Sequence, residues 1–206
     1  MIGTRKERLE CLDQLYPVWE EQSIWTMFEK NCRRFGGNTF ILTENSAYTY
    51  LETREQAEHL AAVMQSMRIR AGDHVALQLP NCAEHVFLTL ALSRIGAVRV
   101  PLHLKMSEVY FRFVLQKADI SWIFSVGFST EHFCCTIADG QWFRRKGKEL
   151  EPVCSWEEFC HTRGEPGEGG VSSRIGRNPE ISDILFTSGS TCEPKGVMLQ
   201  ADALLR

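Results

Sequence analysis

Apolar residues recur at helical spacing in four segments upstream of residue 120. Side chains three, four and seven positions apart lie on the same face of a helix, so each segment predicts a helix with one apolar face. Residues at the segment ends fit this interpretation, because Gly36 and Gly96 can stop a helix and Asn81 and Ser107 can cap the start of one. The predicted helices cover residues 23–35, 51–67, 82–95 and 107–117.

Short apolar runs between these segments predict β-strands. Two of the runs flank the turn residues Asn45 and Ser46 and predict a hairpin, and Pro80 and Pro101 follow two others. Strands that alternate with helices at this spacing favour βαβ crossover units and a largely parallel sheet, so the expected fold class is α/β. The predicted strands cover residues 39–42, 47–50, 74–79, 97–100 and 120–126.

The chain after residue 127 has a less regular pattern. Residues 136–143 are expected to hold a short hairpin around Asp139 and Gly140, and residues 156–161 are expected to form one or two helical turns. Residues 163–179 are rich in Gly, Pro and Ser and predict a flexible connection. We therefore expect an extension over residues 1–22, followed by one domain over residues 23–206.

The segment 185–199, which reads LFTSGSTCEPKGVML, carries the clearest candidate chemistry. Its apolar start leads into a loop of Ser, Thr and Gly residues that closes on Pro194, Lys195 and Gly196. Glycine lets a backbone approach a ligand closely, while amides, hydroxyls and a lysine can bind phosphate oxygens. The segment therefore predicts a phosphate-binding loop, and a solvated turn between two strands is the alternative.

The loop differs from the Walker A pattern, which needs Gly-Lys followed by Ser or Thr. Its order of hydroxyl-rich loop, Pro194, Lys195 and Gly196 resembles instead the phosphate loop of the adenylate-forming superfamily. That superfamily contains acyl-CoA synthetases, adenylation domains of peptide synthetases, and luciferases.

Residues 48–102 extend the resemblance to the amino-terminal subdomain of acyl-CoA ligases. The shared markers are the Gly72-Asp73 turn, the Leu79-Pro80-Asn81 stop, and Gly96-Ala97-Val98 leading to Val100-Pro101. The sequence as a whole is most similar in character to carnitine/crotonobetaine-CoA ligases and medium-chain acyl-CoA ligases. The resemblance implies that the chain folds as the N-terminal part of the acyl-CoA synthetase large domain, with a poor match between residues 127 and 178.

The resemblance also implies a role for each loop residue. Hydroxyls and amides of the loop would bind the β and γ phosphates of ATP, two glycines would give the backbone freedom, and Lys195 would be the catalytic electrostatic clamp. Cys192 stands where the family usually has glycine. The implied site consists of Thr187, Ser188, Gly189, Ser190, Thr191, Lys195 and Gly196.

The implied reaction has two steps. A carboxylate attacks the α-phosphate of ATP to give an acyl-adenylate and pyrophosphate, and a thiol, usually that of coenzyme A, then displaces AMP to give a thioester. Two anions must meet in the first step, so positioning and charge neutralisation dominate, normally with Mg²⁺ on the phosphates. The implied small-molecule partners are thus ATP, Mg²⁺, a carboxylic acid and coenzyme A.

The chain ends at Arg206, soon after the loop. Family members carry their adenine, acyl and coenzyme A sites and a C-terminal domain further on, so we expect an N-terminal fragment that is inactive alone and associates through exposed surfaces. A non-catalytic nucleotide-binding or partner-binding module is the second hypothesis. A general NTPase is the third, and the position of Lys195 argues against it.

Composition excludes several other classes. The net charge is −3 without a strongly basic face, which argues against nucleic-acid binding. The charged first residues do not predict a secretory signal, and the apolar tract at 86–92 is too short to span a bilayer, so we expect a cytoplasmic protein. The eight cysteines form no CxxC pair. We interpret the following group as buried thiols and surface histidines rather than a metal site: His132, Cys134, Cys135, Cys154, Cys160 and His161.

Overall fold

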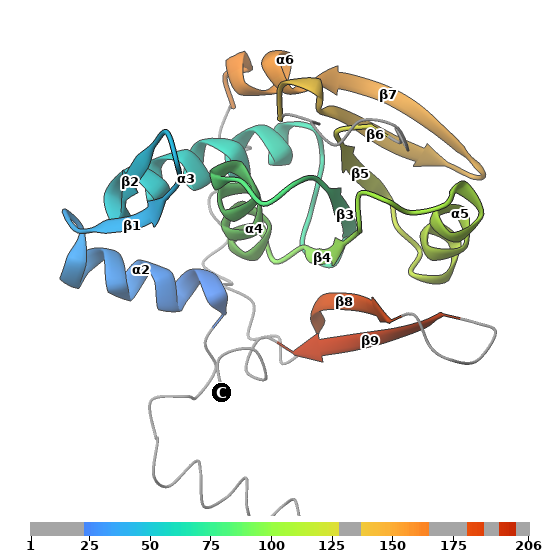
Figure 1. Ribbon diagram of the computed structural model, residues 1–206, viewed down its shortest axis with the longest axis horizontal. Coiled ribbons are helices and arrows are strands. Elements are labelled where there is room, and N and C mark those ends of the chain that lie inside the picture. The colour runs from blue at the N-terminus through green and yellow to red at the C-terminus, as the bar shows by residue number, and fades with distance from the viewer. Residues whose placement is uncertain (1–22, 128–136, 165–180, 188–193, 201–206) are drawn as a thin grey trace, which may run out of the picture.

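The computed structural model describes residues 23–127, 137–164, 181–187 and 194–200, and its centre is a seven-stranded sheet (Figure 1). The strand order is β7-β6-β5-β3-β4-β8-β9. The four inner strands β5, β3, β4 and β8 run parallel, while β6, β7 and β9 pair antiparallel at the two sides. The predicted α/β class with a largely parallel sheet is therefore confirmed. The strands are β3 (His74–Gln78), β4 (Val98–Pro101), β5 (Trp122–Ser125), β6 (Gln141–Lys146), β7 (Glu149–Ser155), β8 (Ile181–Thr187) and β9 (Lys195–Gln200).

Helices cover both faces of this sheet, because side chains alternate between the faces along each strand. On β3, Val75 and Leu77 belong to one core cluster, while Ala76 between them belongs to another. The first cluster also contains side chains of α3, α4 and α6, and the second contains side chains of α5. Figure 1 shows α5 separated from α3 and α4 by the strands. The helices are α2 (Ile24–Phe35), α3 (Tyr50–Ser66), α4 (Ala83–Ile95), α5 (Glu108–Lys117) and α6 (Trp156–His161).

The capping residues explain where several helices begin and end. Ser107 accepts a hydrogen bond from the amide of Tyr110 and starts α5, and Gly96 ends α4 with φ of 82°, so both predictions are confirmed. The predicted cap Asn81 is wrong, since α4 begins one residue later with Cys82 at the cap. Cys82 makes no side-chain capping bond. Cys82 has an extended backbone (φ −145°, ψ 169°), so the helix begins one residue later than the sequence suggested.

A predicted hairpin lies elsewhere than expected. Residues 137–139 form a short 3-10 helix, and the hairpin is β6–β7, with its turn at Gly147 (φ 63°). Gly140 is needed for close packing, since a Cβ there would overlap the ring of Phe124. The basic residues at 144–148 lie on the strands and turn of this hairpin, where Arg145 pairs with Asp119.

A small second sheet lies beside α2 (Figure 1). Strands β1 (Thr39–Leu42) and β2 (Ala47–Thr49) pair antiparallel, as predicted. Thr49 then starts α3 through a capping box, in which it accepts from the amide of Glu52 and the Glu52 carboxylate accepts from the amide of Thr49.

The two outer strands of the large sheet differ in chemistry. Strand β7 contains Glu149, Glu151 and Pro152 beside the exposed Val153, while β9 presents two exposed apolar side chains, Val197 and Met198. The expected extension at 1–22 and most of the expected connection at 163–179 fall outside the described residues. Among the residues that the structure describes, no helix combines the length and apolar character that a bilayer crossing requires.

Candidate functional site

The β8–β9 hairpin holds the ends of the predicted phosphate loop close together. Thr187, the last residue of β8, pairs with Lys195, the first residue of β9. The intervening residues 188–193, which include the predicted site residues Ser188, Gly189, Ser190 and Thr191, lie outside the described residues. The structure thus shows that the two ends of the loop meet across one strand pair.

The two side chains at this hairpin end are open to solvent. Thr187 and Lys195 are both exposed, and no described residue forms an ion pair with Lys195. A hydroxyl group and an ammonium group are therefore available side by side at the mouth of the loop. Both groups can donate hydrogen bonds to phosphate oxygens.

Gly196 has a packing role that the sequence did not indicate. It pairs with Phe186, and a Cβ at position 196 would lie 3.2 Å from Phe186 Cζ and 3.4 Å from Ile184 Cγ2. Its φ lies outside the left-handed region, so the backbone at this position does not itself demand glycine. Gly196 therefore leaves room for the aromatic ring of Phe186 beside β9.

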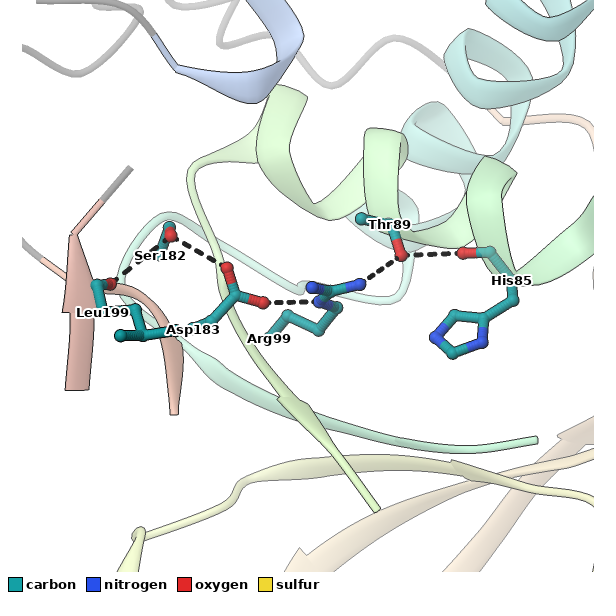
Figure 2. Close-up of polar contacts among 6 residues, drawn as sticks. All are labelled: His85, Thr89, Arg99, Ser182, Asp183 and Leu199. Carbon is teal, nitrogen blue, oxygen red and sulfur yellow. Dashed lines mark hydrogen bonds and ion pairs between the residues drawn. The ribbon is translucent and has the colours of Figure 1, made fainter. Parts of the chain in front are cut away.

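A polar chain connects this hairpin to the rest of the domain (Figure 2). Arg99 Nε on β4 donates to Asp183 Oδ1 on β8 at 2.5 Å, and Arg99 Nη1 donates to Thr89 Oγ1 on α4 at 2.8 Å. The Thr89 hydroxyl in turn donates to the carbonyl of His85 at 2.7 Å. Because Asp183 is only 3% exposed, the Arg99 guanidinium supplies the charge that makes its burial tolerable.

The chain continues to the second strand of the hairpin. Ser182 Oγ donates to Asp183 Oδ2 at 2.8 Å and lies 3.4 Å from the carbonyl oxygen of Leu199 on β9. Both strands that carry the loop are thus connected through polar groups to β4 and α4.

His85 lies at the other end of this chain. Burial lowers the pKa of its imidazole, and the positive charge of Arg99 lowers it further. Its Nε2 atom is buried and has no hydrogen-bond partner. His85 is therefore an uncharged neighbour of the Arg99–Asp183 pair at neutral pH.

Sequence reasoning missed Arg99 and Asp183. The two residues are 84 positions apart, and no local pattern connects them. A signal was nevertheless present in each strand, because Arg99 interrupts the apolar run at 97–101 and Asp183 precedes the apolar run at 184–186. A charged residue inside an apolar strand is a reason to look for a buried partner.

Part of the cysteine group, Cys154, Cys160 and His161, lies among the described residues. Cys154 and Cys160 are partly buried, and burial raises the pKa of both thiols. The described residues contain no group of three His, Cys, Asp or Glu side chains arranged to hold a metal ion. We therefore assign no described residue to Mg²⁺, which in such sites is bound largely by phosphates and water.

Comparison with known proteins gives consistent results. The AMP-binding enzyme family profile matches residues 28–206. The crotonobetaine/carnitine–CoA ligase of Escherichia fergusonii is 28% identical over 200 residues, which cover 86% of this chain and 36% of the ligase. The same enzyme from Escherichia coli O127:H6 is 27% identical with the same coverage. The chain thus spans about a third of the length of these curated relatives.

Solved structures match the same region. The N-terminal subdomain of Klebsiella oxytoca NpsA superposes with a TM-score of 0.70 at 25% identity and covers 88% of this chain and 43% of that one. Bacillus subtilis o-succinylbenzoate CoA synthetase, solved with its acyl-adenylate intermediate, gives a TM-score of 0.66 at 20% identity and covers 87% and 42%. The expected fold, the N-terminal part of an adenylate-forming domain, is confirmed by these superpositions.

Proposed function

Because this chain belongs to the AMP-binding enzyme family, we propose that its residues 187–196 bind the phosphates of ATP for the activation of a carboxylic acid. The first product would be an acyl-adenylate, and transfer to the thiol of coenzyme A would follow. The observation that carries the proposal is the pairing of Thr187 with Lys195 at the mouth of the loop, with both side chains exposed. The names of the relatives support the acyl-CoA product and make a betaine-like acid a substrate to test first.

Lys195 would offset the negative charge of the reacting groups. The acid carboxylate and the triphosphate are both anions, and negative charge builds up on the pyrophosphate as it leaves. An ammonium group that no described residue neutralises can offset this charge, while the Thr187 hydroxyl and the loop amides would hold the phosphates in place. The proposed site residues are Thr187, Ser188, Gly189, Ser190, Thr191, Lys195 and Gly196.

A titration of the 206-residue chain with ATP and Mg²⁺ tests the proposal. We expect Lys195→Ala to weaken ATP binding about tenfold or more, since a charged contact to phosphate contributes roughly 1.5–3 kcal/mol. Lys148→Ala is the matched control, because Lys148 is an exposed lysine in the turn of the β6–β7 hairpin. Equal affinities of the Lys195→Ala protein and the unchanged protein would refute the phosphate role.

A second candidate is a nucleotide-binding or partner-binding module without turnover. The chain aligns with 36% of the length of the curated relatives, so the comparison covers only part of those ligases. Exchange of labelled pyrophosphate into ATP, with a panel of carboxylic acids that includes betaines, separates the two candidates. Exchange that depends on the acid shows turnover by this chain and supports the ligase function, whereas ATP binding without exchange supports a chain that binds nucleotide without turnover of its own.

A further inference from the structure

Strand β8 lies alongside β4, and Ile184 packs into the second core cluster, but the registered backbone pairing between the β8–β9 hairpin and the sheet is short. Its own two strands pair at six positions, and β3 pairs with β4 at four. Strand β8 meets β4 at only one registered pair, Arg99 and Asp183. The same two residues form the ion pair, so one pair of residues provides both the registered backbone pairing of β4 with β8 and a side-chain contact between them.

This pair also connects the hairpin to a helix. Arg99 uses two different nitrogen atoms, one for Asp183 and one for Thr89 on α4 (Figure 2). Ser182 carries the connection on to the backbone of β9. A guanidinium group has donors in a fixed planar arrangement, so these contacts define an orientation as well as a distance.

The structure assigns Arg99 as a positioning residue, an inference that rests on the proposed function: its contacts with Asp183 and Thr89 fix the direction in which the hairpin presents Thr187 and Lys195. Asp183 is four residues before Thr187, which is about 13 Å along an extended strand. A tilt of about 5° at Asp183 therefore moves the end of the hairpin by about 1 Å, and binding and catalytic geometry are sensitive to displacements of that size.

The test compares Arg99→Met with a variant of matched burial. Arg94 is 21% exposed against 23% for Arg99, and it forms an ion pair with Glu58 at 3.1 Å that connects α4 to α3 instead of the hairpin. Hydrogen exchange and ATP titration of the 206-residue chain are measured for both variants. Arg99→Lys, which keeps the charge and loses the second donor group, serves as the milder substitution if Arg99→Met does not fold.

We expect Arg99→Met to accelerate amide exchange in residues 181–187 and 195–200 by about tenfold or more relative to β3 and β5, and to weaken ATP binding about tenfold. Arg94→Met should leave the exchange rates of the hairpin and the affinity for ATP near those of the unchanged protein. This should hold even if Arg94→Met lowers the melting temperature as much as Arg99→Met does. Arg99→Lys should fall between the two.

Unchanged exchange in the hairpin of Arg99→Met, or equal effects of Arg94→Met, would overturn the positioning role. If the unchanged protein does not bind ATP at all, the proposed function fails, and the exchange data still decide whether Arg99 holds the hairpin.

Discussion

Replacing Arg99 and Asp183 separately and together gives an ordered set of stabilities. Arg99→Met leaves a carboxylate that is 3% exposed without its cation. Breaking a fully buried ion pair by removing one partner costs about 3–5 kcal/mol. Arg99 is 23% exposed and Ser182 still donates to Asp183, so water and the hydroxyl offset part of this cost. We therefore expect a loss of about 2–3 kcal/mol in the free energy of unfolding.

The partner substitution is expected to cost less. Asp183→Leu leaves a guanidinium group that keeps its bond to Thr89 and reaches water, and the new side chain is apolar and near in volume. We expect a loss of about 1 kcal/mol for this variant. The double variant should lie within about 1 kcal/mol of the unchanged protein, because it leaves no buried charge. The coupling energy between the two positions is therefore about 2–4 kcal/mol.

Urea unfolding followed by tryptophan fluorescence measures these differences, since Trp25, Trp122 and Trp142 are all buried. The slope of free energy against urea must stay constant for the comparison to hold. In a chain of this size, 2–3 kcal/mol lowers the melting temperature by roughly 5–10 °C. The reasoning is refuted if Asp183→Leu costs as much as Arg99→Met, or if the double variant shows the sum of both losses.

Two other predictions concern the core and the thiols. Gly140→Ala should destabilise the domain by about 1–3 kcal/mol in urea unfolding, because its Cβ would overlap the Phe124 ring and lie 2.8 Å from the carbonyl oxygen of Ile137; a neutral result would mean that the ring moves freely. Burial raises the pKa of Cys82 and Cys160 from 9.0 to about 11, so both thiols should alkylate slowly at pH 8 by mass spectrometry. Since the unfolded chain loses these protons first, stability should fall between pH 9 and 11, and replacing both cysteines by alanine should flatten that fall.

Local signals in the sequence were sufficient for much of the fold. The start of α5 follows from the hydroxyl of Ser107, and the end of α4 follows from Gly96, because both depend on the backbone within one turn. The hairpin at β6–β7 could not be placed in the same way. Gly140 looks like a turn residue, yet its role depends on the ring of Phe124 on a neighbouring strand.

In the candidate site, too, the sequence indicated the local features and did not indicate the long-range contacts. The composition of the segment 185–199 predicted a phosphate-binding loop, with a turn between two strands as the alternative, and the structure shows that Thr187 and Lys195 pair in a hairpin. The groups that hold this hairpin in place come from β4 and α4, far away in the chain. Such contacts become visible only after strand order is known, and strand order is a property of the whole sheet.

The unlike outer strands of the sheet set a limit on self-association. A β-sheet grows into a fibre only if both of its edges accept another chain. The β7 edge carries two acidic residues and a proline that has no N–H to donate, while the β9 edge carries Val197 and Met198. Among the described residues, two copies that paired through β9 would have their β7 strands outermost, and the acidic residues and the proline there disfavour the addition of a third copy.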